Sequence, residues 1–176
     1  MIDGGNIKKD NTKAALDKFG KYLVKEARKN LTRQKKNNTK ALYKSIDYEV
    51  DVMPNSLTFD FVMQEYGEWV DKGRRAGKMP PVRNSKGEGI LNWVEHKRIQ
   101  FRDNSGKFES YRTTAFIIAQ SIKKRGIPAT KFYTRPFNLG FAKLPRELTE
   151  AYALDVTEFL DYTLNELNTK YKDGSK

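Results

Sequence analysis

Asp71, Glu95 and Lys97 are the residues of this chain that come nearest to a catalytic set. Metal-dependent nucleases use an acidic residue followed later by Glu-x-Lys, because the carboxylates bind a divalent cation and the lysine assists a water molecule. The three side chains must then converge at the end of a strand. The residues around Glu95 have the pattern of a helix, on which positions 95 and 97 point in different directions. The sequence therefore argues against a nuclease centre, and this activity is kept only as an alternative.

Other patterns of catalysis or metal binding are missing from the sequence. Cysteine is absent and His96 is the single histidine, which excludes a thiolate nucleophile and nearly excludes a structural zinc site. No serine lies in a Gly-x-Ser-x-Gly elbow, and residues 86–89 lack the spacing of a phosphate-binding loop. No apolar run approaches the roughly 18 residues of a membrane span, and an apolar signal-peptide core is missing. We expect a protein without enzyme activity, cofactor or metal, and with neither membrane insertion nor export.

The net charge of +12 is distributed in blocks of alternating sign along the 176 residues. Residues 1–44 carry 13 Lys and Arg against 4 Asp and Glu, whereas residues 45–71 carry 7 acidic residues and no basic ones. Residues 72–146 carry 18 basic against 4 acidic residues, and residues 147–176 carry 3 against 7. Such blocks favour contact between an acidic surface of one copy and a basic surface of the next. The alternative is that each block is only a solvated face.

The spacing of apolar residues predicts an α+β fold, in which an antiparallel β-sheet is flanked by a long N-terminal helix and a long C-terminal helix. Apolar residues recur at steps of three and four from about residue 12, after a cap at Asn11 or Thr12, to residue 33, and again over 144–167. Period-two alternation over 47–53 and 57–63 predicts a hairpin with a tight turn and an acidic outer face, formed by Asp47, Glu49, Asp51 and Asp60. We expect further helical segments at 41–46, 64–71, 90–98 and 113–125, and an extended segment at 127–137.

These elements predict one α+β domain at residues 11–168, between a flexible N-terminal arm at 1–10 and a flexible C-terminal tail at 169–176. Residues 72–89 interrupt the domain with glycines, prolines and basic residues, which predicts an extended loop or arm. The segment has too few apolar residues to pack on its own domain, so we expect it to gain order mainly from a partner. Its candidate contact residues are Arg74, Arg75, Lys78, Arg83 and Lys86.

Non-specific contact with nucleic acid is a second interpretation of the basic segments. The N-terminal helix, the loop and the cluster at residues 123–125 could contact phosphates, and such contacts need no reading of base sequence. The sequence contains no recognition-helix or RNA-binding signature. A DNA-associated basic protein, or a soluble α+β domain with a merely basic surface, therefore stays open as an alternative.

Several short stretches, taken in order, resemble the tail-completion proteins of long-tailed bacteriophages, which join head and tail in the neck. They are the amphipathic first helix, the stretch TKALYKSI before the predicted sheet and YGEWVDKG after it, followed by ILNWVEHKRI, AFIIAQSIKKRGI and FYTRPF. Together these stretches cover roughly residues 12–165. Because each stretch is short and none carries a catalytic residue, their order carries the resemblance.

This resemblance implies a structural virion protein that is assembled in the bacterial host cytoplasm. Its subunits would form a homo-oligomeric ring between portal and tail proteins, around the DNA channel. The stretch YGEWVDKG would then be the exit from the sheet, and the basic residues that follow it would begin an arm. We expect this arm to reach the acidic hairpin face of a neighbouring subunit, or the channel DNA.

Overall fold

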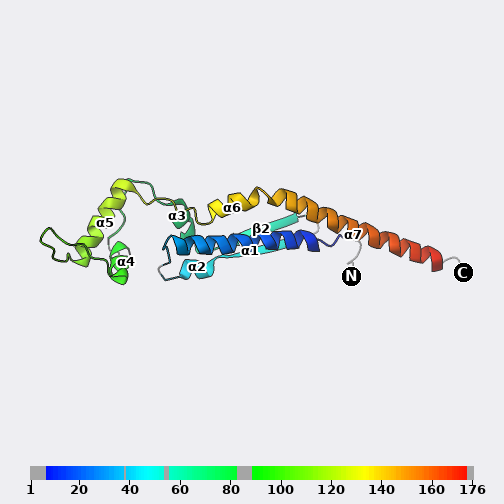
Figure 1. The fold of residues 1–176 in the computed structure, drawn as a ribbon, viewed down its shortest axis with the longest axis horizontal. Coiled ribbons are helices and arrows are strands. Elements are labelled where there is room, and N and C mark those ends of the chain that lie inside the picture. The colour runs from blue at the N-terminus through cyan, green and yellow to red at the C-terminus, as the bar shows by residue number, and fades with distance from the viewer. Residues whose placement is uncertain (1–6, 38, 54–55, 83–88, 174–176) are drawn as a thin grey trace. The chain divides into compact units, whose positions relative to one another are not determined.

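A computed structural model describes residues 7–37, 39–53, 56–82 and 89–173 of the chain. The described residues form seven helices and one two-stranded antiparallel sheet, so the fold is α+β (Figure 1). The elements in chain order are α1 (Asp10–Arg33), α2 (Ala41–Ser45), β1 (Asp47–Met53), β2 (Ser56–Val62), α3 (Tyr66–Lys72), α4 (Ile90–Lys97), α5 (Tyr111–Arg125), α6 (Thr134–Phe141) and α7 (Leu144–Asp173). In the part of the chain described, no helix is both long and apolar enough to cross a membrane.

The chain divides into two compact units. Unit 1 comprises Met1–Gly67 together with Lys131–Lys176, and unit 2 comprises Glu68–Thr130. From the sequence we expected one domain at residues 11–168, with an extended loop at 72–89. Long-range contacts define the two units, and such contacts are not visible in the periodicity of a single sequence.

Unit 1 is built around α1, whose apolar stripe was predicted from its spacing. Leu16, Phe19 and Leu23 are buried and form a core with Leu144 at the start of α7. The half-buried faces of the hairpin and of α6 pack against this core through Phe59 and Phe137, whose rings lie 5.1 and 5.8 Å from that of Phe19. The single apolar stripe of α1 thus contacts the sheet, α6 and α7, which explains its burial.

The helices α1 and α7 run side by side in opposite directions (Figure 1). Lys18 of α1 lies 3.7 Å from Glu147 near the start of α7, whereas Asn11 and Thr12 bond to Asp155, further along α7. We expected Asn11 or Thr12 to cap α1 with its own side chain, and this prediction was wrong. The helix begins at Asp10 without a local side-chain cap, and the carboxylate of Asp155 accepts hydrogen bonds from the first backbone N–H groups instead.

The hairpin has the predicted strands and faces. β1 coincides with the predicted segment, and β2 begins and ends one residue earlier than predicted. Tyr48, Val50, Phe59 and Phe61 are half-buried, and the acidic residues between them are exposed. One face therefore packs on α1 and the other faces solvent, as the alternation indicates. The predicted turn includes Pro54 and Asn55, which lie outside the described residues.

The extended segment predicted at 127–137 is wrong in its second half, where α6 begins at Thr134. Pro136, a residue type common in extended chain, is the third residue of this helix. A proline is tolerated in the first turn because the N–H that it lacks would have no partner inside the helix. Gly140 then allows close packing, since a Cβ there would lie 2.8 Å from the Phe19 ring. The α7 helix also extends to Asp173, into the segment expected to be a tail.

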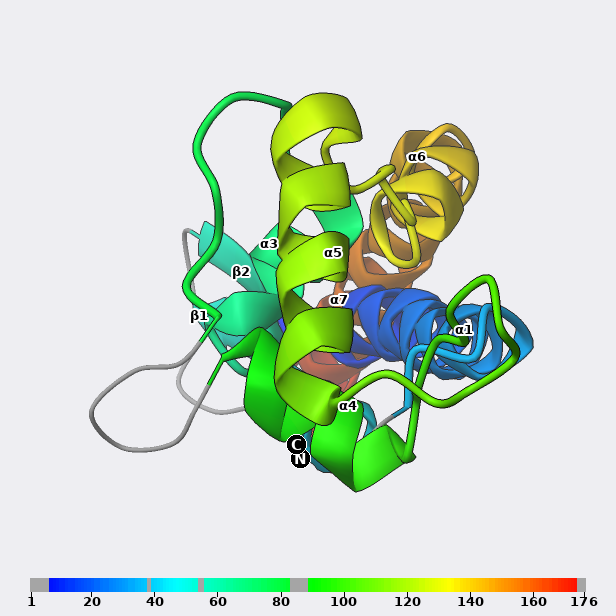
Figure 2. The ribbon, with the colours of Figure 1, turned by 90° about the vertical axis from the view of Figure 1, so that its left-hand side faces the viewer.

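Unit 2 contains α4 and α5, which pack on each other (Figure 2). Helix α5 begins at Tyr111, two residues before the predicted start, because Ser110 caps it by accepting a 3.0 Å hydrogen bond from the Thr113 N–H. Lys123, Lys124 and Arg125 lie in its last turn, where cations favour the helix dipole. Between the two helices, Arg102 and Phe108 form an antiparallel β-bridge.

The two segments that enter and leave unit 2 are bonded to each other. Arg74 and Ile127 exchange two backbone hydrogen bonds of 2.8 Å, and the Thr130 hydroxyl donates to the Val70 carbonyl at 2.7 Å. Gly73 and Gly126 adjoin this bridge, with φ angles of 72° and 74° that favour glycine. A Cβ on either residue would also overlap the backbone of the opposite segment. These two glycines therefore permit the bridge.

Candidate functional site

The acidic face of the hairpin is formed as the sequence predicted. Asp47, Glu49 and Asp51 are exposed on β1, and Asp60 is exposed on β2. Within the described residues, none of these four carboxylates takes part in an ion pair. The face therefore presents uncompensated negative charge to solvent, on the side opposite the core of unit 1.

Two of these carboxylates are directly opposite each other across the sheet. The register pairs Glu49 with Asp60, while Asp47 pairs with Val62 and Asp51 with Thr58. Like charges opposite each other destabilise an antiparallel pair, whereas opposite charges stabilise it by about 0.2–1 kcal/mol. The Glu49–Asp60 pair thus costs the isolated chain some stability. A binding partner of positive charge would remove this repulsion.

The basic segment of unit 2, which begins at Lys72, is bonded to other residues of that unit over positions 74–78. Arg75 and Lys78 are exposed and Arg74 is half-buried, and none of the three forms an ion pair within the described residues. The Arg74 guanidinium donates to the Lys78 carbonyl at 2.8 Å, and the Gly77 N–H donates to the Lys123 carbonyl at 2.8 Å. Arg83 and Lys86 lie outside the described residues.

This anchoring differs from our expectation that the segment would not pack on its own domain. The expectation considered only apolar side chains, but residues 74–77 are held by backbone hydrogen bonds, which need none. Lys72 ends α3 and Gly89 precedes α4, so the limits of the predicted loop agree with the helix ends. The cations are consequently presented from a fixed backbone at residues 74–77.

Trp69 is a candidate contact residue that the sequence analysis missed. Its side chain is 72% exposed on α3, although a tryptophan in an apolar pattern is normally assigned to the core. Trp69 lines a hollow of about 710 Å³ together with Lys72, Arg74, Arg75 and Lys78. An exposed aromatic ring among cations is suited to binding a protein partner or a nucleic acid. In the sequence, the short distance between Trp69 and the basic residues that begin at Lys72 could have indicated this surface.

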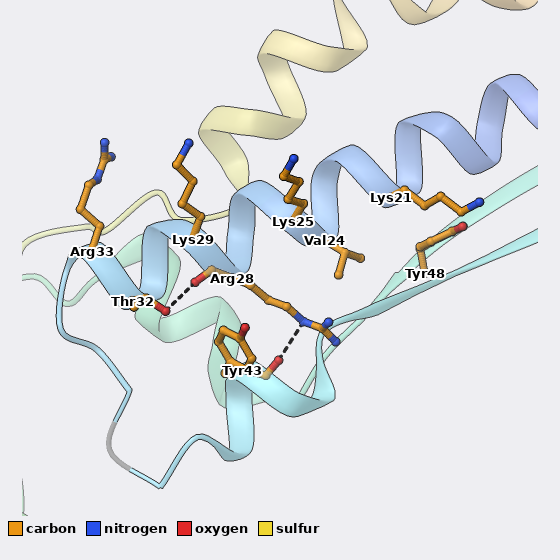
Figure 3. Close-up of a pocket in the computed structure, with 9 residues that line it drawn as sticks. All are labelled: Lys21, Val24, Lys25, Arg28, Lys29, Thr32, Arg33, Tyr43 and Tyr48. Atoms are coloured by element: carbon orange, nitrogen blue, oxygen red, sulfur yellow. Dashed lines mark hydrogen bonds between the residues drawn. The ribbon is translucent and has the colours of Figure 1, made fainter.

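A second basic surface lies on α1 in unit 1 (Figure 3). It is a groove of about 800 Å³ lined by Lys21, Val24, Lys25, Arg28, Lys29, Thr32, Arg33, Tyr43 and Tyr48. Lys25, Lys29 and Arg33 extend in a row along one side of the helix, each four residues from the next. Like charges at this spacing destabilise a helix. We call this surface the α1 groove.

The two tyrosines of the α1 groove are fixed by interactions inside unit 1. Arg28 donates to the carbonyls of Tyr43 and Ile46, at 3.1 and 2.8 Å, and its guanidinium lies 5.4 Å from the Tyr43 ring centre. The Tyr48 ring stacks on Phe59 at 6.0 Å and fills the space beside Gly20. Burial raises the pKa of Tyr48, and its hydrogen bond to Asp17 raises the pKa further. Both rings therefore have contacts within unit 1.

The candidate nuclease residues are not arranged as that chemistry requires. Asp71 is buried in α3, whereas Glu95 and Lys97 are exposed on α4, which is helical as predicted. Glu95 and Lys97 are two positions apart on this helix, so their side chains diverge. Among the described residues, no group of three or more His, Cys, Asp or Glu could hold a metal ion. His96 is exposed on the same helix.

Comparison with known proteins gives no relative from which a role could be transferred. No family model, curated protein or solved structure matches the chain. The functional argument therefore rests on the residues and surfaces of this chain.

Proposed function

We propose that this chain is a structural protein of a tailed bacteriophage, a head–tail joining or tail-completion subunit that forms a ring in the neck. The ring lies between the portal and the tail and surrounds the DNA channel. The order of the short stretches that resemble tail-completion proteins supports this role. In this proposal the protein is assembled in the bacterial host cytoplasm and remains in the virion.

The observation that carries the proposal is the presence of two complementary surfaces on one chain. The acidic face of unit 1 presents Glu49 and Asp60, and the basic segment of unit 2 presents Arg75 and Lys78. Unlike surfaces that join copies of one chain make heterologous contacts, which close into a ring when the rotation between copies allows it. Trp69, beside the basic segment, supplies the kind of aromatic anchor that dominates the energy of many protein interfaces.

Binding to DNA is the second candidate function, and the cations around Trp69 favour it. Basic side chains contact phosphates, and an exposed indole ring stacks on a base. In a neck ring the two functions are compatible, because the channel contains DNA. The alternative is a DNA-associated protein that is not part of a particle.

Electron microscopy of particles from a tailed phage that encodes this chain tests the proposal. We expect several copies arranged with rotational symmetry at the junction of head and tail. A single copy per particle would contradict the ring. If the chain is missing from particles but is recovered with DNA from infected cells, the second candidate function is correct.

A further inference from the structure

The C-terminal half of α7 carries an apolar stripe that unit 1 leaves exposed. Leu160, Leu164 and Leu167 are 53, 57 and 46% exposed, and their spacing of four and three residues places them on one side of the helix. The N-terminal half of α7 uses a different side, where Leu144, Ala151 and Asp155 are buried. The helix thus has two faces, of which one belongs to the core of unit 1.

This stripe lies beyond the start of α1. The bonds from Asn11 and Thr12 place the first turn of α1 beside Asp155. Because the two helices are antiparallel, the 18 residues of α7 after Asp155 continue past α1 for about 27 Å, at 1.5 Å per residue. The α1 groove extends in the opposite direction, from Lys21 to Arg33. The two surfaces therefore lie at opposite ends of unit 1, and a chain cannot place its own stripe in its own groove.

The chemistry of the α1 groove matches that of the stripe. Val24, the ring edges of Tyr43 and Tyr48, and the aliphatic stems of the lysines provide an apolar floor. The charged ends of Lys25, Lys29 and Arg33 lie in a row on one side of this floor (Figure 3). A suitable partner carries aliphatic side chains next to carboxylates. On α7, Asp161 follows Leu160 by one residue, and residues 147–176 have 7 acidic against 3 basic side chains.

The fixed tyrosines favour a protein partner over nucleic acid at this groove. A base needs an open ring face on which to stack. In the α1 groove, Arg28 lies over the Tyr43 ring and Phe59 is stacked on Tyr48. One face of each ring is thus in contact with a residue of unit 1, which reduces the ring surface on which a base could stack, whereas the ring edges and lysine stems suit leucine side chains.

We infer that the exposed stripe of α7 in one copy docks in the α1 groove of the next copy. The inference rests on the ring proposed above and names a second contact between its subunits, separate from the acidic face and the basic segment. Because the joined surfaces are unlike and lie at opposite ends of unit 1, the contact is head-to-tail. Each copy would then use its stripe on one neighbour and its groove on the other.

Cross-linking between single-cysteine variants tests this contact, because the natural chain contains no cysteine. Purified full-length Lys29→Cys and Leu164→Cys proteins are mixed and treated with a short bis-maleimide, and the same pair is tested in joined particles. We expect a covalent dimer that contains one copy of each variant. The control pairs Lys29→Cys with Thr169→Cys, because Thr169 is exposed on the other side of α7. Its yield should be at least tenfold lower.

A charge exchange between Lys25 and Asp161 tests whether the α1 groove binds α7 of another copy or nucleic acid. Lys25→Glu in the groove-side protein should reduce the cross-link at least tenfold, and Asp161→Lys in the stripe-side protein should restore much of it. No cross-link in either sample, although microscopy shows a ring, would overturn this contact and leave the proposed function in place. If microscopy also shows no ring, both this contact and the proposed function are wrong. If Lys25→Glu instead weakens binding of a duplex oligonucleotide and leaves the cross-link unchanged, the groove binds nucleic acid and the inference is wrong.

Discussion

The Thr12 hydroxyl donates a 2.5 Å hydrogen bond to the buried carboxylate of Asp155, which lies 143 positions later in the chain. The same carboxylate accepts from the backbone N–H groups of Asn11 and Thr12, at 2.9 and 3.0 Å. Asp155 therefore caps α1 from α7 and satisfies donors that α1 leaves without a local cap. This contact also places Asp155 beside the first turn of α1, so the residues of α7 after Asp155 extend past the start of α1.

The first prediction concerns the stability contributed by this cap. Asp155→Asn replaces one accepting oxygen with an amide nitrogen, so that in either orientation of the amide the backbone N–H of Asn11 or of Thr12 loses its acceptor. A buried donor left without a partner costs about 1–3 kcal/mol, so the free energy of unfolding should fall by that amount. Urea denaturation followed by circular dichroism measures the change. Asp161→Asn, an exposed site on the same helix, is the control, and an equal loss in both variants would contradict the role of the cap.

The second prediction is the pH dependence of the same contact. Burial raises the pKa of Asp155, but the hydrogen bonds from Thr12 and Asn11 together lower it by more than burial raises it. The pKa of Asp155 in the folded protein therefore lies below the ordinary value. The unfolded chain therefore binds this proton at higher pH than the folded chain, and the stabilisation is complete above the unfolded pKa of about 4. It is lost as the pH falls through the folded pKa. The difference in Tm between natural protein and Asp155→Asn should thus be constant near neutral pH and shrink in acid. A difference that grows in acid would show the opposite sign.

A third prediction follows from the repulsion on the hairpin. Glu49→Lys converts the Glu49–Asp60 pair into opposite charges across the sheet, which should raise the free energy of unfolding by about 0.2–1 kcal/mol. Thr58→Lys, opposite Asp51, should have an effect of the same sign. Urea denaturation at low ionic strength checks both variants. A decrease in stability for both would show that the acidic face is already compensated in solution.

Regular periodicity explains which elements could be predicted from the sequence. The stripe of Leu16, Phe19 and Leu23 and the alternation around Val50 each identify one buried face, so α1, β1 and β2 were found within two residues. Pro136 concealed α6, because a proline gives the same local signal in extended chain and in the first turn of a helix. The Asp155 cap joins residues far apart, and no local pattern encodes it.

The candidate surfaces were predictable to the extent that charge alone defines them. Asp47, Glu49, Asp51 and Asp60 follow directly from strand alternation, and the structure places all four on one exposed face. The anchoring of Arg74 could not be read from side chains, since it depends on backbone bonds to Ile127. Trp69 was missed because an aromatic residue in a helix has the same sequence signal whether it is buried or exposed.

The fourth prediction is that the purified protein does not cleave DNA. Glu95 and Lys97 diverge on α4, and a metal-assisted cleavage needs convergent ligands. Supercoiled plasmid incubated with the protein and Mg²⁺ or Mn²⁺ should remain intact over hours. Cleavage that is lost on Glu95→Gln, but kept in Glu109→Gln at another site in unit 2, would establish the nuclease instead.

The last prediction concerns the basic segment and its partner. Arg74→Glu/Arg75→Glu should impair the joining of heads to tails, because it places like charges against the acidic face of the neighbouring copy. The fold should survive, since the bridge between Arg74 and Ile127 uses backbone atoms. Arg75 is exposed, and the half-buried Arg74 loses one side-chain hydrogen bond, which contributes about 0.5–1.5 kcal/mol. Lys107→Glu/Arg112→Glu makes the same charge change on exposed residues elsewhere in unit 2 and is the control. Joining is measured by counting tailed particles in an in vitro complementation assay.

Charge exchange on the hairpin then identifies the surface that Arg74 and Arg75 contact. Glu49→Lys/Asp60→Lys, in the same chain as Arg74→Glu/Arg75→Glu, restores attraction between neighbouring copies and should recover joining if the acidic face is the partner. Recovery cannot occur if the arginines contact channel DNA, because reversing the hairpin leaves the DNA phosphates unchanged. Normal joining by the Arg74→Glu/Arg75→Glu protein at physiological salt would show that this segment takes no part in assembly.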